Sequence, residues 1–104
     1  MDSASELVTL LKENFCPNVY LQPGDDVHLN YPCIVLNPTG VFDKAANAKS
    51  MYVGMVSYQM TYMAKRRDFS LTQRFMRELP YCRLTSYFVS NGVYHDVYTI
   101  YYKL

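Results

Sequence analysis

The chain has 104 residues and a formal net charge of +1, and its composition is 50% apolar and 18% charged. This length predicts one domain over residues 1–104, and the apolar content excludes a disordered segment. The near-neutral charge gives no general attraction to nucleic acid or to anionic membranes. The chain also lacks a run approaching the roughly 20 apolar residues that span a bilayer, and its acidic start does not resemble a secretory signal.

The first fifteen residues predict an amphipathic helix with Ser3 or Ser5 as its N-cap, ended by the Cys16-Pro17 pair. Its apolar face is formed by Leu7, Leu10, Leu11 and Phe15. A short strand is expected at residues 19–21, before the turn sequence QPGDD.

Residues 31–36 predict a second strand, whose continuous apolar run indicates that both faces are covered. Residues 37–50 show little periodicity and predict a long loop.

Residues 51–64 predict the longest strand. Its side chains alternate, with Tyr58, Met60 and Tyr62 on one face and Ser57, Gln59 and Thr61 on the other. At about 3.3 Å per residue this strand would extend about 46 Å, whereas a compact domain of this length is roughly 33 Å across. The strand therefore bends, carries a bulge or overhangs the body. An overhanging strand exposes unpaired backbone groups, which favours a component of an assembly.

A second helix is predicted from a capping-box pattern, Ser70 followed by Gln73, and it is ended by Pro80. Its apolar stripe is formed by Leu71, Phe75, Met76 and Leu79. Two further strands complete the chain. The predicted fold is α+β, in the order α-β-β-β-α-β-β, with a mainly antiparallel sheet of four or five strands and two helices on one face.

The closing hairpin allows two registers. A two-residue turn at Asn91-Gly92 would pair Phe88 with His95, whereas a three-residue loop over 90–92 would pair Phe88 with Tyr94. We predict the three-residue loop, because it also pairs Leu84 with Tyr98 and Cys82 with Ile100 and so gathers apolar residues on one face.

This register places Tyr94, Tyr98 and Ile100 in the core, with Asp96 beside Ser86 near the exposed end of that face. The outer face then carries Tyr87, His95 and Tyr101, which a neighbouring subunit could cover.

The candidates for chemistry are few. His95 and Asp96 are neighbours on a predicted strand, so their side chains point to opposite faces and cannot form a catalytic pair. Asp25, Asp26 and His28 are plausible metal-ligand types, but no ligand spacing supports them, and a solvated turn is the expectation. We therefore expect no enzyme activity, no cofactor and no metal.

The three cysteines, Cys16, Cys33 and Cys82, are far apart and odd in number, which predicts reduced, mostly buried thiols. The eleven tyrosines are unusual for this length. Tyrosine is a good strand former, and it is also enriched in subunit contacts because it joins a large apolar ring to a polar tip.

A basic cluster, AKRRDF at 64–69, is followed by two arginines on the second predicted helix. Such a cluster near tyrosines could contact phosphates, but nearby acidic residues and the near-neutral total charge weaken that interpretation. A basic rim around a DNA passage stays possible without specific contacts. The candidate residues for a rim, or for another acidic partner, are Lys44, Lys49, Lys65, Arg66 and Arg67.

The order of these patterns resembles the small tail-terminator proteins of long-tailed bacteriophages, also called tail-to-head joining or neck proteins. The stretches that carry the resemblance are YVGMVSYQMTYMAKRRD, SLTQRFMRELP and YCRLTSYFVSNGVYHDVYTIYY. The corresponding pieces are an N-terminal helix at 7–15, a strand at 31–36, a tyrosine-rich strand at 52–62, a short helix at 71–80 and a hairpin at 88–102.

The resemblance implies a structural virion protein at the head-tail junction, assembled in the host bacterial cytoplasm. Six copies would form a ring that caps the tail tube and joins it to the head connector or head-completion protein, with DNA passing through the lumen without sequence-specific binding. Under this interpretation Tyr58, Tyr62, Tyr87, His95 and Tyr101 are candidate subunit-interface residues.

Two alternatives stay open: another phage neck or minor capsid component of the head-closure type, and a small non-enzymatic host-directed binding protein that acts as a monomer or dimer.

Overall fold

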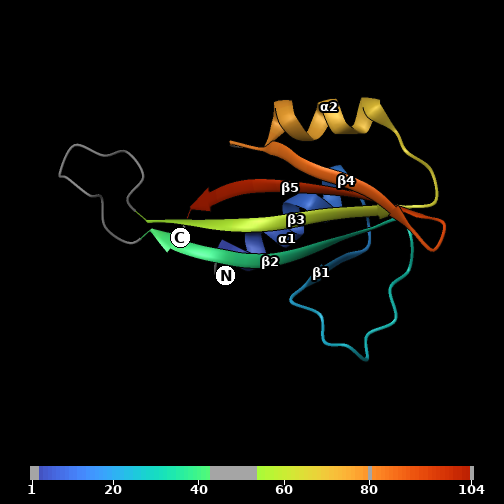
Figure 1. Ribbon diagram of the computed structural model, residues 1–104. Coiled ribbons are helices and arrows are strands. Elements are labelled where there is room, and N and C mark those ends of the chain that lie inside the picture. Colours follow the sequence, from blue (N-terminus) through green and yellow to red (C-terminus); the bar gives the residue numbers. More distant parts are fainter. Residues whose placement is uncertain (1–2, 43–53, 80, 104) are drawn as a thin grey trace.

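The computed structural model describes residues 3–42, 54–79 and 81–103. In chain order the elements are α1 (Ser3–Asn14), β1 (Val19–Leu21), β2 (Cys33–Phe42), β3 (Met55–Ala64), α2 (Phe69–Glu78), β4 (Arg83–Ser90) and β5 (Val93–Lys103). This confirms the α+β class and the predicted element order (Figure 1). The five strands form one sheet in the order β1-β2-β3-β5-β4. The sheet is mixed, because β1 pairs parallel with β2 while the other pairings are antiparallel.

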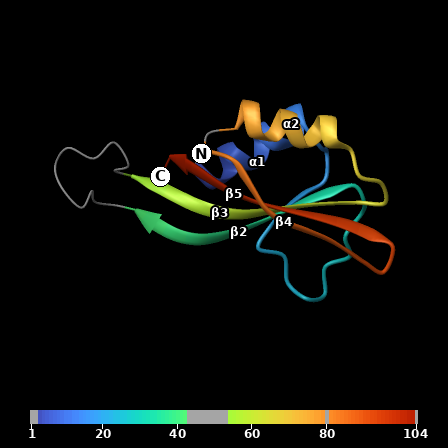
Figure 2. The same cartoon turned by 45° about the horizontal axis from the view of Figure 1, so that its top comes forward.

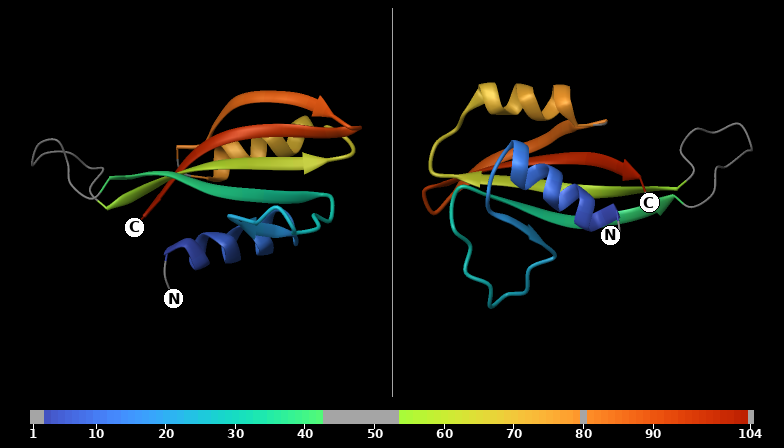
Figure 3. Two further views of the ribbon diagram at one scale, coloured as in Figure 1. Left: turned by 60° about the horizontal axis from the view of Figure 1, so that its bottom comes forward. Right: turned by 180° about the vertical axis from the view of Figure 1, so that it is seen from behind.

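Both helices pack on one face of this sheet. Figure 2 shows them together on the same side, and the rear view in Figure 3 shows α1 crossing in front of the strands. The rings of Phe15 and Phe75 stack at 4.7 Å and join the two helices. Arg74 of α2 adds a hydrogen bond of 2.8 Å to the carbonyl oxygen of Asn14. The fully buried side chains of this core include Leu7, Leu11, Ile34, Leu36, Met60, Phe75, Tyr98 and Ile100.

The sheet alternates between this covered face and a helix-free face. Met60 lies opposite Leu36 on one side and Tyr98 on the other, so these three side chains share the covered face. The next position along β3, Thr61, lies between Val35 and Val97 on the helix-free face. The predicted alternation of β3 is therefore confirmed. The first residues predicted for this strand, 51–53, lie outside the described residues.

The prediction of a loop from residue 37 is wrong for its first part, because β2 continues to Phe42. β1 reaches only as far as Leu36, so β2 is an outer strand beyond that point. Pro38 is tolerated there because no partner strand on the outer side of β2 needs the N–H that proline lacks. A bulge between Pro38 and Gly40 adds one residue before pairing with β3 resumes. Figure 1 shows the β2–β3 pair running on past both helices.

The prediction that Ser70 caps α2 is also wrong. Asp68 is the N-cap, and its carboxylate accepts hydrogen bonds from the backbone N–H groups of Ser70 and Leu71 at 3.0 and 3.4 Å. An aspartate one position before the helix reaches these unpaired donors directly. Thr72 rather than Met76 completes the buried face beside Phe75. At the other end of the chain α1 begins at Ser3, so Ser5 lies inside its first turn and does not cap it.

The predicted three-residue hairpin loop is replaced by a two-residue turn. Asn91 and Gly92 both have positive φ, at 52° and 76°, as a type I′ turn requires. Phe88 therefore pairs with His95 and not with Tyr94. A bulge between Leu84 and Ser86 then shifts the pairing by one residue and restores the predicted partner of Leu84, which is Tyr98. The bulge inside β4 thus keeps Leu84 on the covered face, whereas Phe88 lies with His95 on the helix-free face and not on the predicted apolar face.

Candidate assembly surface

The helix-free face of the sheet lies outside the main core cluster, although Val35, Ser57 and Thr61 on it are buried. Its side chains come from β2, β3, β4 and β5 and mix apolar with uncharged polar groups. They include Val35, Asn37, Ser57, Gln59, Thr61, Met63, Ser86, Phe88, His95, Val97, Thr99 and Tyr101. Within the described strands the charged residues of this face, Arg83 and Lys103, lie near its margin, and Lys103 pairs with Glu6 at 3.2 Å.

Low charge and the presence of aromatic and methionine side chains are typical of the centre of a protein interface. A solvated face of an antiparallel sheet is usually more polar. Figure 1 looks onto this face, and no described helix lies in front of it. The helix-free face is therefore a candidate surface for contact with another protein.

A hairpin projects beside this face, and an arginine holds it in place. Arg67, in the connection between β3 and α2, forms an ion pair of 3.1 Å with Asp96 of β5. Its guanidinium lies 4.9 Å from the ring centroids of both Tyr87 and Tyr94. The side chains of Arg67 and Asp96 are 17% and 7% exposed, so water screens this pair little. The Arg67 clamp, formed by these four residues, ties the connection to both strands of the hairpin.

Sequence reasoning missed this clamp. It expected Asp96 near an exposed end beside Ser86, but Asp96 is buried, and Tyr87 is its cross-strand partner. The ion pair joins residues 29 positions apart, and no local pattern links them. The sequence offered one indication of the clamp: Asp96 was predicted on an apolar face, and a buried carboxylate needs a partner.

The five candidate interface residues, four tyrosines and one histidine, lie on different faces of the sheet. Tyr58 is 2% exposed and belongs to the core. Tyr62 packs against Phe75 on the same covered face, with ring centroids 5.7 Å apart. Because Tyr87 pairs with Asp96, it also lies on the helix side of the sheet, which corrects its predicted outer position.

His95 and Tyr101 lie on the helix-free face as predicted. His95 stacks on Phe88, with ring centroids 4.6 Å apart and an interplanar angle of 10°. The helix-free face therefore retains two of the five candidates.

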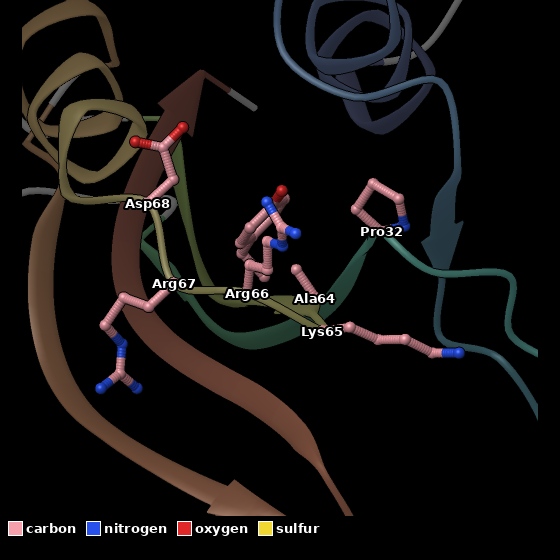
Figure 4. A pocket seen from close by; sticks show the side chains of 7 residues that line it. Pro32, Ala64, Lys65, Arg66, Arg67 and Asp68 are labelled. Atoms are coloured by element: carbon pink, nitrogen blue, oxygen red, sulfur yellow. The ribbon is translucent and has the colours of Figure 1, made fainter.

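The candidate basic residues also differ in their surroundings. Lys65 and Arg66 are exposed, whereas Arg67 is committed to its clamp. Lys44 and Lys49 lie outside the described residues. Figure 4 shows Arg67 directed toward the β4–β5 hairpin, while Lys65 points the opposite way. An open hollow of about 540 Å³ lies beside these residues, lined also by Pro32, Tyr62, Ala64 and Asp68.

The described part of the chain shows little that could perform chemistry. All three cysteines are free, and burial raises the pKa of Cys33 to about 11 and of Cys82 to about 12. These thiols stay protonated at neutral pH and are poor nucleophiles. Burial likewise raises the pKa of Tyr98 to about 12, against the lowering effect of its hydrogen bond to Thr72.

Among the described residues, no three histidine, cysteine, aspartate or glutamate side chains gather closely enough to hold a metal ion. Neither described helix is long and apolar enough to cross a membrane.

Comparison with known proteins adds no relative: no family model matches the chain, and no curated protein matches it.

Proposed function

We propose that this protein is a structural virion protein of a long-tailed bacteriophage, a tail terminator at the head-tail junction. Copies of the chain form a six-membered ring that caps the completed tail tube and joins it to the head connector. DNA passes through the lumen, and no bond chemistry is required.

The observation that carries the proposal is the helix-free face. A ring closed by a repeated head-to-tail contact needs two different surfaces on each copy. Here the covered face builds the fold, and the opposite face keeps a weakly charged, partly aromatic surface that no described helix covers, which would supply one of the two contact surfaces. The element order and the long β2–β3 pair agree with the family resemblance.

Electron microscopy of negatively stained protein, alone and mixed with purified tail tubes, tests the proposal. Six-fold rings, or caps at tube ends, are the expected result. Attachment along the sides of tubes, or to empty heads alone, would contradict it.

Light scattering after size-exclusion chromatography separates the proposal from a small binding protein. A stable dimer in solution would favour the binding protein, because an isolated two-fold pair leaves no head-to-tail contact for a ring.

A further inference from the structure

The connection between β3 and α2 borders an open hollow that carries two cations without a partner. This basic hollow, about 540 Å³ in volume, is lined by Pro32, Tyr62, Ala64, Lys65, Arg66, Arg67 and Asp68. Lys65 and Arg66 are exposed and form no ion pair with any described residue. The hydroxyl of the half-buried Tyr62 likewise has no hydrogen-bond partner among the described residues. Figure 4 shows the Arg66 side chain between those of Asp68 and Pro32. The hollow therefore offers three donors that the described part of its own copy does not use.

The charges that line the hollow do not balance. The guanidinium of Arg67 is paired with Asp96 at 3.1 Å. The carboxylate of Asp68 lines the hollow and also caps α2 through hydrogen bonds from Ser70 and Leu71. The cations of Lys65 and Arg66 set against the one carboxylate of Asp68 leave a net charge of +1. An anionic group is the chemistry that this hollow fits.

A turn beyond β1 carries the opposite charge. The N–H of Val27 donates to the carbonyl oxygen of Gly24 at 3.2 Å, so Asp25 and Asp26 hold the two central positions of a β-turn. Both carboxylates are exposed and form no ion pair with any described residue. Val27, directly after them, is 43% exposed. This acidic turn, residues 24–27, projects from the sheet beyond β1 (Figure 1).

Hydrogen bonds at both ends of the segment hold the acidic turn in place. On the β1 side, the N–H of Gln22 donates to the carbonyl oxygen of Leu36 at 2.8 Å. On the β2 side, the side-chain amide of Asn18 donates to the carbonyl oxygens of Asn30 and Pro32, each at 3.2 Å. A segment that is already ordered loses little conformational entropy when it binds.

We propose that the acidic turn of one copy enters the basic hollow of the next copy in the ring. This inference rests on the proposed function. The turn carries two free carboxylates, and the hollow carries two free cations and a free hydroxyl. No ion pair joins the turn to the hollow within the described part of one copy. Because the turn and the hollow are different surfaces, their contact repeats head to tail, as ring closure requires.

The choice of the occupant rests on charge complementarity within the chain itself. The other carboxylates of the described residues are paired, cap α2 or, in Glu13, directly follow a lysine. The acidic turn is thus the described part of the surface that supplies two adjacent free carboxylates. Its exposed Val27 also matches the exposed Pro32 at the margin of the hollow.

The contact has a defined chemistry. Carboxylate oxygens of Asp25 and Asp26 accept hydrogen bonds from the Lys65 ammonium, the Arg66 guanidinium and the Tyr62 hydroxyl. Charge pairs of this kind raise the rate of association and fix the orientation of the partners more than they add affinity. The turn and the hollow therefore set which way each subunit faces its neighbour.

Charge reversal on each side tests the contact. The turn-reversed variant carries Asp25→Lys and Asp26→Lys, and neither residue has a positive φ that lysine would disfavour. The hollow-reversed variant carries Lys65→Glu and Arg66→Glu, and a third variant carries all four changes. Each variant, and an equal mixture of the first two, is incubated alone and with purified tail tubes. Negative stain counts rings and capped tube ends, light scattering gives the particle mass, and the melting temperature of each variant shows whether it folds.

The control reverses charge elsewhere on the surface. Lys12→Glu with Arg77→Glu changes the net charge by the same amount as the hollow-reversed variant. Both positions are exposed on the helices and unpaired within the described residues. This control should form rings or caps as the unmodified protein does.

We expect the turn-reversed and hollow-reversed variants each to form at least about tenfold fewer rings or caps, because like charges then meet at the contact. The variant with all four changes should recover assembly, since its charges are complementary again. The mixture should also recover it, as rings in which the two variants alternate. If the hollow-reversed variant does not fold, Lys65→Gln with Arg66→Gln removes both charges, and a loss in the same direction is expected.

Four results would overturn the inference. Normal assembly of both reversed variants, with the unmodified protein active, would reject the contact and leave the proposed function standing. Reversed variants that fold and lose assembly, without recovery in the mixture or in the variant with all four changes, would show that these charges do not meet each other. A mixture that forms two-subunit particles would show a reciprocal contact about a two-fold axis. Failure of the unmodified protein to form rings or caps would reject the proposed function and this contact with it.

Discussion

The two faces of the sheet share the same strands and differ in what they do. On β3, Met60 is fully buried beneath the helices, while its neighbour Gln59 is exposed on the helix-free face. The free energy of folding comes mainly from burial of apolar surface, which is concentrated on the covered face. Side chains on the helix-free face can therefore be suited to binding a partner with little loss in the free energy of unfolding. Substitutions on the two faces should separate stability from assembly.

The largest effect is expected from Phe75→Ala. Phe75 is fully buried and contacts Phe15, Tyr62 and Tyr98 between the helices and the sheet. Its truncation should lower the free energy of unfolding by about 3–5 kcal/mol, the range for a large core residue replaced by alanine. Chemical denaturation measures this. Met76→Ala, one position along and exposed, is the control and should change stability by at most about 0.5 kcal/mol. Equal losses in the two variants would contradict the assignment of Phe75 to the core.

A smaller loss is expected from Asp96→Ala, which leaves the Arg67 guanidinium without its counter-charge. Breaking a buried ion pair by removing one partner should lower stability by about 3 kcal/mol, since Arg67 keeps some contact with water. Arg66→Ala, at the exposed neighbouring position, should have little effect. A double-mutant cycle of Arg67→Met and Asp96→Leu should show coupling, because the pair is replaced by apolar groups together. Additive losses would mean that the clamp stabilises little.

The cap of α2 should contribute less and should depend on pH. Hydrogen bonds from the Ser70 side chain and from the backbone N–H groups of Leu71 and Ser70 lower the pKa of Asp68 below its ordinary range. A lowered pKa in the folded state means that the contribution is full above the ordinary pKa of an aspartate. It is lost as pH falls through the lowered value.

Asp68→Ala should therefore lower the melting temperature at pH 7, and the difference from the unmodified protein should shrink at pH 3. Asp68→Asn, which keeps a side-chain oxygen for the cap, should retain much of the stability at pH 7. A deficit in Asp68→Ala that is the same at both pH values would contradict the assigned role of the carboxylate.

The smallest effect on stability is expected on the helix-free face. Gln59→Lys places a charge near its centre and should change the free energy of unfolding by at most about 0.5 kcal/mol, as other exposed substitutions do. It should nevertheless reduce ring formation or tube capping, because an unpaired charge is costly at an interface. Gln73→Lys on the exposed side of α2 is the matched control. Normal assembly of Gln59→Lys would show that this face is not the surface that carries the function.

Periodicity and turn chemistry, read from the sequence alone, determined the fold class, the element order and the face of each β3 residue. These features depend on neighbours within a few positions: the spacing of Leu7 and Leu11, the alternation around Met60, and the Asn91-Gly92 pair, which marked the hairpin although the predicted loop length was wrong. Such local preferences are strong where a segment is half buried, since a one-residue slip would expose its apolar side chains.

Only the tertiary structure decided the bulge in β4, the extension of β2 and the Arg67 clamp. The two-residue turn and the pairing of Leu84 with Tyr98 are both present, and the bulge in β4 makes them compatible by shifting the register by one residue. The ion pair between Arg67 and Asp96 forms because the β3–α2 connection and β5 lie side by side, although the two residues are 29 positions apart. Contacts between distant segments depend on how whole elements pack, so these three features became visible only in the assembled sheet.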